Sequence, residues 1–157
     1  MIIRNLMRII FLISLIALVS AYFIEHILGY QPCNLCLMER IPYFLAIIII
    51  LFNIKFNYLE KYFLLILIII FLLATVISLY HLGIEQGFIQ ESLVCDLGTN
   101  YKILSKEEIL QQLQEKKVSC KDVAFKIFGL SLTSLNLAIS ILLTIILTKK
   151  YFLYDKN

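Results

Sequence analysis

The sequence predicts an all-α membrane protein, a bundle of four transmembrane helices with one long extracytoplasmic loop that contains a short amphipathic helix. Three observations support this fold class. Hydrophobic residues make up 61% of the 157 residues, the mean hydropathy is +0.92, and the apolar residues are gathered in four long runs. A soluble domain of this size is much less apolar. We therefore treat residues 1–157 as a single integral membrane domain.

Each apolar run approaches the length of about 20 residues that a helix needs to cross the hydrocarbon core. The second run, from Ile41 to Ile54, is short, and we extend it to Leu37 at the interface. Arg4 precedes the first run and Arg8 lies at its start, as in a signal peptide, but its apolar core exceeds the usual length of about 7–15 residues. We interpret it as a span. The predicted spans are residues 6–28, 37–54, 62–82 and 127–148.

The predicted topology puts both termini on one side of the membrane and the two cysteine-bearing segments, residues 29–40 and 83–126, on the other. Basic residues gather on the terminus side, which the positive-inside tendency assigns to the cytoplasm. The long loop also contains lysines, but acidic residues are interleaved with them. We therefore expect cytoplasmic termini and extracytoplasmic cysteines. The basic residues of the terminus side are Arg4, Arg8, Lys55, Lys61, Lys149, Lys150 and Lys156.

The long polar loop contains one helix signal. Ser105 and Glu108 have the spacing of a capping box, in which each side chain accepts a hydrogen bond from a backbone amide at the start of a helix. A short helix over about residues 106–117 should follow. Its partial apolar stripe would let it lie on the bilayer surface or against the bundle, and ordinary loop packing is the alternative. The stripe consists of Ile109, Leu110 and Leu113.

All four cysteines fall on the extracytoplasmic side, where disulfides persist. Four cysteines allow three full pairings, and the sequence does not choose among them. The spacing suggests a close pair, Cys33 with Cys36, and a pair across the loop, Cys95 with Cys120. Two structural bridges would be one use. A CxxC bridge closes a very small ring, however, and constrains the unfolded chain little, so thiol–disulfide exchange is the use we favour.

Positive potential lies near Cys36 in either geometry that we consider. If the second helix has begun at Cys36, Arg40 is one turn further on. If Pro42 occupies the first turn, the helix starts near Ile41, and Cys36 faces the positive end of the helix dipole. Both arrangements favour a thiolate at Cys36.

Zinc and haem are weaker interpretations of the CxxC motif. A zinc site of this type needs a second closely spaced pair, whereas Cys95 and Cys120 are far apart in the sequence. Leu37 follows Cys36 where haem attachment requires His.

Several polar residues lie near the ends of the predicted spans or within them. His26 and His81 are expected at about the same depth in the membrane as the CxxC motif. Packing or hydrogen bonding is the default role for such residues, and their position gives a weaker indication of function. Asn136 on the fourth span is interpreted as an interhelical hydrogen-bonding residue. Solvation at the interface is the default for the acidic residues Glu25, Glu39 and Glu85.

A thiol pair that oxidises other thiols repeatedly needs an acceptor for two electrons. The sequence contains no signature of haem, flavin or an iron–sulfur cluster. A small apolar acceptor dissolved in the bilayer would meet a CxxC at the mouth of a helical bundle. A quinone is therefore the natural candidate.

Four segments of the chain resemble the DsbB family of disulfide bond formation proteins, in its alphaproteobacterial form. They are "PCNLCLMER" from Pro32, "YHLGIEQGF" from Tyr80, "VCDL" from Val94 and "VSCKDVAFKIFGLSLTSLN" from Val118. The resemblance implies a quinone-dependent protein-disulfide oxidoreductase of the bacterial inner membrane. The cofactor would be ubiquinone or menaquinone, and the partner a periplasmic DsbA-like thiol oxidase.

The resemblance also implies roles for individual residues. Cys95 and Cys120 would form the outer disulfide, and the partner would attack Cys95. Cys120 would then exchange with Cys33, and Cys36 would form a thiolate–quinone contact. Arg40 and His81 would lie beside the quinone, with Arg40 favouring the anionic forms. The catalytic residues would thus be Cys33, Cys36, Cys95 and Cys120, and the cofactor-binding residues Cys36, Arg40 and His81.

Three alternatives remain at this point. A DsbI-like enzyme with a dedicated partner would share the same chemistry. A protein like vitamin K epoxide reductase would carry its CxxC late in the chain, whereas here the motif follows the first span. A non-enzymatic membrane protein would use its disulfides only to hold the loop.

Overall fold

The computed structural model describes residues 2–55, 60–90, 95, 119–121, 126–127 and 129–155. These residues are almost entirely helical, which confirms the predicted fold class. The loop helix predicted at residues 106–117 lies outside the described residues. The elements are α1 (Ile2–His26), α2 (Asn34–Met38), α3 (Ile41–Lys55), α4 (Glu60–Glu85), β1 (Lys126–Ile127), β2 (Leu130–Ser131) and α6 (Leu132–Asp155).

Four helical stretches are long and apolar enough to cross a membrane, as the sequence predicts: Arg4–His26, Asn34–Ile54, Glu60–Glu85 and Leu132–Leu153. A helix is suited to this role because it satisfies its own backbone hydrogen bonds where water is absent. Large apolar side chains such as Ile16, Phe44 and Leu142 are exposed on the outside of the bundle. Such a surface is typical of helices that face lipid tails.

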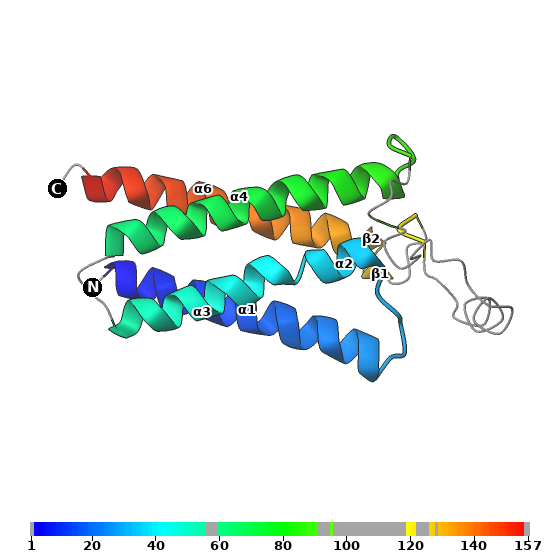
Figure 1. Ribbon diagram of the computed structural model, residues 1–157, viewed down its shortest axis with the longest axis horizontal. Coiled ribbons are helices and arrows are strands. Elements are labelled where there is room, and N and C mark those ends of the chain that lie inside the picture. Colours follow the sequence, from blue (N-terminus) through cyan, green and yellow to red (C-terminus); the bar gives the residue numbers. More distant parts are fainter. Residues whose placement is uncertain are drawn as a thin grey trace, which may run out of the picture.

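The four long helices form one bundle, with the two termini at one end and α2 and the two short strands at the other (Figure 1). α1 packs on α3, α3 on α4, and α4 most extensively on α6. Each helix contributes to a common core, for example Ile10 of α1, Ala46 of α3, Phe71 of α4 and Leu147 of α6. The bundle thus brings segments far apart in the sequence together at the cysteine-bearing end.

Polar contacts also join the helices inside the bundle. Asn136 of α6 donates from Nδ2 to Ser78 Oγ of α4 at 2.8 Å and accepts a hydrogen bond from the Tyr43 hydroxyl of α3. One amide therefore links three helices, in the interhelical role interpreted from the sequence.

The second span is interrupted near its extracytoplasmic end. α2 ends at Met38, a turn follows at Glu39 and Arg40, and α3 begins at Ile41. Pro42 occupies the first turn of α3, where its missing amide proton and fixed φ are tolerated. The break lets α2 form a separate short helix that carries both cysteines of the CxxC motif.

The fourth span begins later than the sequence indicated. β1 and β2 pair antiparallel, with Lys126 opposite Ser131 and Ile127 opposite Leu130. Gly129 lies in the turn between them with φ +84°, a conformation that favours glycine. α6 therefore starts at Leu132, where the apolar run alone suggested residue 127.

Candidate functional site

Cys33 and Cys36 lie at the N-terminal end of α2. Cys33 is the N-cap residue, and its sulfur accepts a hydrogen bond from the Cys36 amide at 3.3 Å. The cap and the third residue after it lie one helical turn apart, so the two sulfur atoms are only 2.7 Å apart. All four cysteines are free thiols in the structure. Forming a bond between Cys33 and Cys36 requires little movement.

The other two cysteines lie against this pair. Cys120 and Cys33 are buried in one cluster, with exposed fractions of 2% and 5%, and Cys36 and Cys95 pack against that cluster. Asn34 of α2 donates from Nδ2 to the backbone oxygen of Cys95 at 3.1 Å, which ties the residue to the CxxC helix. The structure thus brings together all four cysteines singled out in the sequence. The remaining members of the cluster are Leu35, Ile84 and Tyr80.

The buried thiols are held in the protonated form. The hydrogen bond with Cys36 and then burial raise the pKa of Cys33, while the bond to His81 opposes them. Burial raises the pKa of Cys120, and the neighbouring Cys95 thiol acts in the same direction. Because the thiolate is the nucleophile in disulfide exchange, each of these thiols needs help to ionise.

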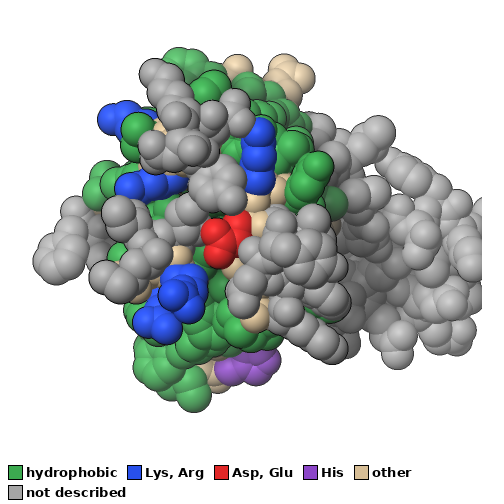
Figure 2. All heavy atoms as spheres, turned by 90° about the vertical axis from the view of Figure 1, so that its left-hand side faces the viewer, with side chains coloured by type: hydrophobic (Ala, Val, Ile, Leu, Met, Phe, Trp, Pro, Cys, Tyr) green, Lys and Arg blue, Asp and Glu red, His purple; other side chains and the backbone are tan. Residues whose placement is uncertain are grey.

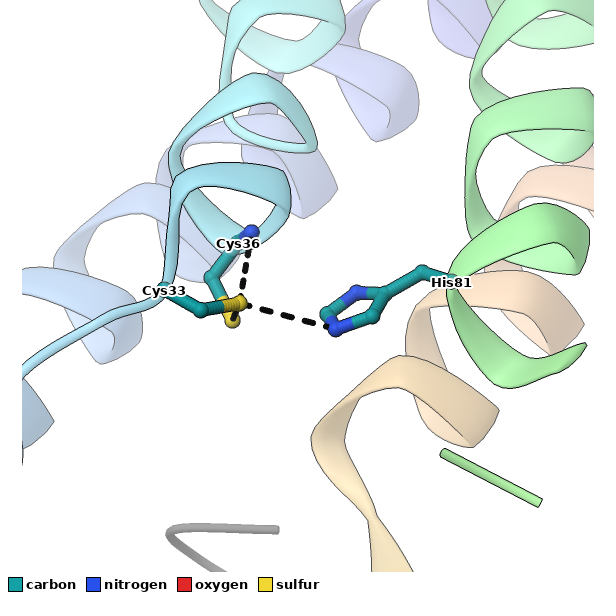
Figure 3. Close-up of side chains that lie close together, drawn as sticks. All are labelled: Cys33, Cys36 and His81. Carbon is teal, nitrogen blue, oxygen red and sulfur yellow. Dashed lines mark hydrogen bonds between the residues drawn. The ribbon is translucent and has the colours of Figure 1, made fainter. Parts of the chain in front are cut away.

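His81 of α4 faces Cys33 across the mouth of the bundle (Figure 3). Its Nε2 lies 3.5 Å from Cys33 Sγ, and its Nδ1 lies 3.1 Å from Glu39 Oε1 and 3.3 Å from Thr133 Oγ1. The imidazole is 1% exposed. The Glu39 carboxylate, the His81 imidazole and the Cys33 thiol therefore form a chain of contacts. Glu39 comes from the α2–α3 turn, His81 from α4, and Cys33 from the start of α2.

A second acidic residue, Glu85, also lies close to His81. Glu85 accepts a hydrogen bond from Thr133 Oγ1 at 2.6 Å, and the same carboxylate oxygen lies 3.9 Å from His81 Nε2. The expectation that Glu39 and Glu85 are solvated does not hold, because the structure turns both toward His81. Sequence reasoning missed them because the contacts join α4 to α6 and to the break in the second span. The i,i+4 spacing of His81 and Glu85 was the one available signal.

Arg40 lies against α1. Its Nη1 donates to Glu25 Oε2 at 2.5 Å, and its guanidinium carbon is 5.0 Å from the centroid of the Tyr22 ring. Arg40 therefore fastens the end of α1 to the turn that follows Cys36. His26 is exposed and bonded to the Tyr22 carbonyl oxygen on its own helix. Among the described contacts, those of His26 stay within α1.

The donor atoms of Cys33, Cys36 and His81 lie within 4.8 Å of one another. Two thiolates on one tetrahedral zinc ion are separated by about 3.8 Å, given zinc–sulfur bonds of about 2.3 Å. The observed separation of 2.7 Å is shorter. The geometry therefore suits a pair that exchanges a disulfide better than a pair that shares a metal ion.

A thiol pair at the mouth of a membrane bundle, with two further thiols packed on it and an imidazole beside it, defines a membrane thiol–disulfide exchange protein. Comparison with known proteins gives the family. The family model described as "Disulfide bond formation protein DsbB" matches residues 3–149. The chain belongs to the DsbB family. Members of this family are inner-membrane disulfide oxidoreductases that use quinones and act with DsbA-like partners.

Two curated relatives agree with this assignment. "Uncharacterized protein RP370" of Rickettsia prowazekii (strain Madrid E) is 39% identical over 137 residues, which cover 86% of this chain and 80% of that protein. "Disulfide bond formation protein B" of Acinetobacter baumannii is 25% identical over 141 residues, which cover 86% of this chain and 82% of that protein. No solved structure matches the chain significantly.

Proposed function

We propose that this protein re-oxidises a reduced, DsbA-like thiol oxidase of the periplasm and passes the two electrons to a membrane quinone, ubiquinone or menaquinone. The observation that carries the proposal is the gathering of all four cysteines at one end of the bundle. A quinone supplies a two-electron acceptor that is soluble in the bilayer.

The proposed relay runs from Cys95 to Cys36. A thiolate of the partner attacks Cys95 of the Cys95–Cys120 disulfide, which releases the Cys120 sulfur. Cys120 attacks Cys33 of the Cys33–Cys36 disulfide, and Cys36 leaves with the electron pair. The partner's second thiol then releases the oxidised partner from Cys95, Cys95 attacks Cys120, and Cys33 is freed to close the bond with Cys36 again. Each exchange step breaks one sulfur–sulfur bond and forms another. The contacts within the cysteine cluster support this order, because Cys120 lies with Cys33 and Cys95 packs against them.

Cys36 is the most suitable of the four thiols to reach an acceptor in the membrane. It is only partly buried, and Leu37 and Met38 beside it are 44% and 39% exposed. An apolar ring can therefore approach Cys36 from the lipid side. In the proposed site Cys36, Arg40 and His81 hold the quinone head, with Arg40 at the turn that follows Cys36, where it is paired with Glu25.

The proposed orientation has the termini in the cytoplasm and the cysteines in the periplasm. The terminus end of the bundle is rimmed by basic side chains around a central carboxylate (Figure 2). Its described basic residues are Arg4, Arg8, Lys61, Lys149 and Lys150. This distribution supports the orientation through the positive-inside tendency. The thiols then lie where disulfides persist.

A turnover assay tests the proposal. Purified protein in detergent is mixed with an excess of reduced DsbA-like oxidase and either a ubiquinone or a menaquinone analogue. We expect oxidation of the partner in step with quinone reduction, one quinone per disulfide, and a preference between the two analogues. Oxidation that proceeds at the same rate without quinone, or a partner that stays reduced with both analogues, would contradict the proposal.

A further inference from the structure

Cys33 needs a proton acceptor in order to act. In the final step of the proposed relay it closes the bond with Cys36, and it attacks as the thiolate. Its thiol is 5% exposed, so water has little access to it. The raised pKa of this thiol means that few molecules carry the thiolate spontaneously at neutral pH.

His81 is oriented to take this proton. A carboxylate accepts hydrogen bonds, so the contact between Glu39 Oε1 and His81 Nδ1 at 3.1 Å puts the proton of a neutral imidazole on Nδ1. Thr133 Oγ1, at 3.3 Å, faces the same Nδ1, and its own proton goes to Glu85 at 2.6 Å. Nε2 then directs its lone pair at Cys33 Sγ, 3.5 Å away.

Two acidic side chains face His81 from different elements. Once Nε2 takes the proton, the imidazolium lies between Glu39 at Nδ1 and Glu85, whose Oε1 is 3.9 Å from Nε2. Glu85 Oε2 is buried and has no hydrogen-bond partner within the described part of the chain. It therefore retains the capacity to accept a proton or a hydrogen bond. The titratable groups that face the imidazole are Cys33, Cys36, Glu39 and Glu85.

We infer that His81 is the proton acceptor for Cys33, with Glu39 as the residue that positions it; this inference rests on the proposed function. The Cys33 proton moves to His81 Nε2 as Cys33 Sγ attacks the sulfur of Cys36. The new bond joins the two sulfur atoms, and the electron pair of the broken bond leaves with the group on Cys36, which a quinone would supply in turnover and which is thionitrobenzoate in the assay below. The proton leaves His81 by way of Glu85. Carboxylate, imidazole and thiol thus act in the order known from activated cysteine nucleophiles.

The attack of Cys33 on Cys36 can be measured without quinone or partner. In a Cys95→Ser, Cys120→Ser background, 5,5′-dithiobis(2-nitrobenzoate) first modifies the more accessible Cys36 and releases one thionitrobenzoate. Attack by Cys33 then releases a second. The first release reports access and folding, and the second reports the step assigned to His81. No quinone or DsbA-like protein is present in this assay. The role of His81 can therefore be wrong while the proposed function is right, and it can be right while the proposed function is wrong.

We expect His81→Asn and His81→Gln to slow the second release at pH 7 by about 100-fold, the usual contribution of general base catalysis. Asn retains a donor for Glu39 and Gln an amide near the Nε2 position, so at least one of them should keep the fold. The variant rates should rise tenfold per pH unit between about pH 6 and pH 9, because only spontaneously ionised Cys33 then attacks, whereas the parent rate should rise less steeply. Glu39→Gln should show a smaller loss, and the exposed control His26→Gln none.

Two results would overturn the assignment. One is a rate of the second release in His81→Asn that equals the parent rate at every pH. The other is a loss that is the same at every pH, which would mean that His81 only holds the helices in place.

An independent feature lies at the opposite end of the bundle. A cavity of about 470 Å³ opens between the start of α1 and the end of α3, with Arg4, Arg8 and Asn53 among otherwise apolar walls. Neither arginine has an ion pair or hydrogen bond within the described part of the chain. Asn53 is 5% exposed, and its Nδ2 has no partner among the described residues. A buried amide donor of this kind calls for an acceptor.

The geometry points to an anionic phospholipid as the ligand of this cavity. Two arginines one helical turn apart complement a phosphate, the buried amide supplies a hydrogen-bond donor, and apolar walls such as Phe11 and Ile50 suit an acyl chain. Basic pockets between transmembrane helices at the cytoplasmic face commonly bind acidic lipids.

Native mass spectrometry of the full chain in detergent, with added phosphatidylglycerol or phosphatidylcholine, tests the site. We expect the protein to retain at least about threefold more phosphatidylglycerol than phosphatidylcholine. This preference should be lost in the double variant Arg4→Gln, Arg8→Gln and in the single variant Asn53→Leu. The matched control, Lys149→Gln with Lys150→Gln, removes two charges from α6 at the same end and should keep it. Equal retention of both lipids, an equal loss in the control, or displacement by inorganic phosphate alone would overturn the assignment.

Discussion

A Cys36→Ser variant is expected to lose quinone-dependent oxidation of the partner by on the order of 10³-fold or more. Cys36 combines partial exposure with the exposed apolar neighbours Leu37 and Met38, so we expect no other thiol to replace it at the membrane acceptor. Serine has nearly the same size, but its hydroxyl does not ionise at neutral pH and forms no disulfide. The measurement is quinone reduction in the turnover assay.

The same variant separates the enzyme from a protein that uses its disulfides only as staples. Cys33 keeps its place as the cap of α2 and its contact with His81, and the helical bundle should be intact. Met38→Leu is the matched control, since it alters an exposed side chain of the same helix and should retain turnover. Full turnover by Cys36→Ser would rule out the proposed relay.

The spans could be predicted because the membrane imposes a simple rule on composition. A run of about 20 apolar residues has few alternatives to a spanning helix. The break at Glu39 and Arg40 was harder, because the apolar pattern continues on both sides of it. Only Pro42 marked the start of α3 in the sequence. α6 starts later than predicted because β1 and β2 pair before it, with Gly129 in the turn between them. A hydropathy pattern does not reveal so short a strand pair.

Part of the site could likewise be predicted from the sequence, and part could not. The CxxC spacing alone predicts that Cys33 and Cys36 adjoin, because a single helical turn brings them together. The setting of His81 depends on how α4 packs against the α2–α3 turn and α6, and no local pattern encodes that packing. Arg40 shows the limit of reasoning from spacing. It follows Cys36 by four residues, yet the break in the helix turns its guanidinium to Glu25 and Tyr22 on α1.

A Cys95→Ser variant is expected to fail with the protein partner and to work with a small dithiol. Cys95 is where the partner attacks in the proposed relay, and its backbone is held beside the CxxC helix by Asn34. Without this sulfur the partner must reach the buried Cys33 directly, so oxidation of the partner should fall by on the order of 10²-fold or more, because the relay's positioning is lost. Quinone binding should be unchanged.

The companion variant, Cys120→Ser, fixes the order of the relay. Removing Cys120 leaves Cys95 without its resolving thiol in the proposed relay, and Cys95 packs against the cluster that contains Cys120. In this variant, a resolving-cysteine mutant of the partner that was first activated as a mixed disulfide should be trapped on Cys95 and be visible on a non-reducing gel. In Cys95→Ser the same treatment should trap far less. Dithiothreitol is small enough to reach the Cys33–Cys36 bond, so it should drive quinone reduction at a rate within about twofold of the parent in both variants. If Cys95→Ser traps the partner as efficiently as Cys120→Ser, the partner attacks elsewhere, and the gathering of the four thiols serves a different sequence of exchanges from the one proposed.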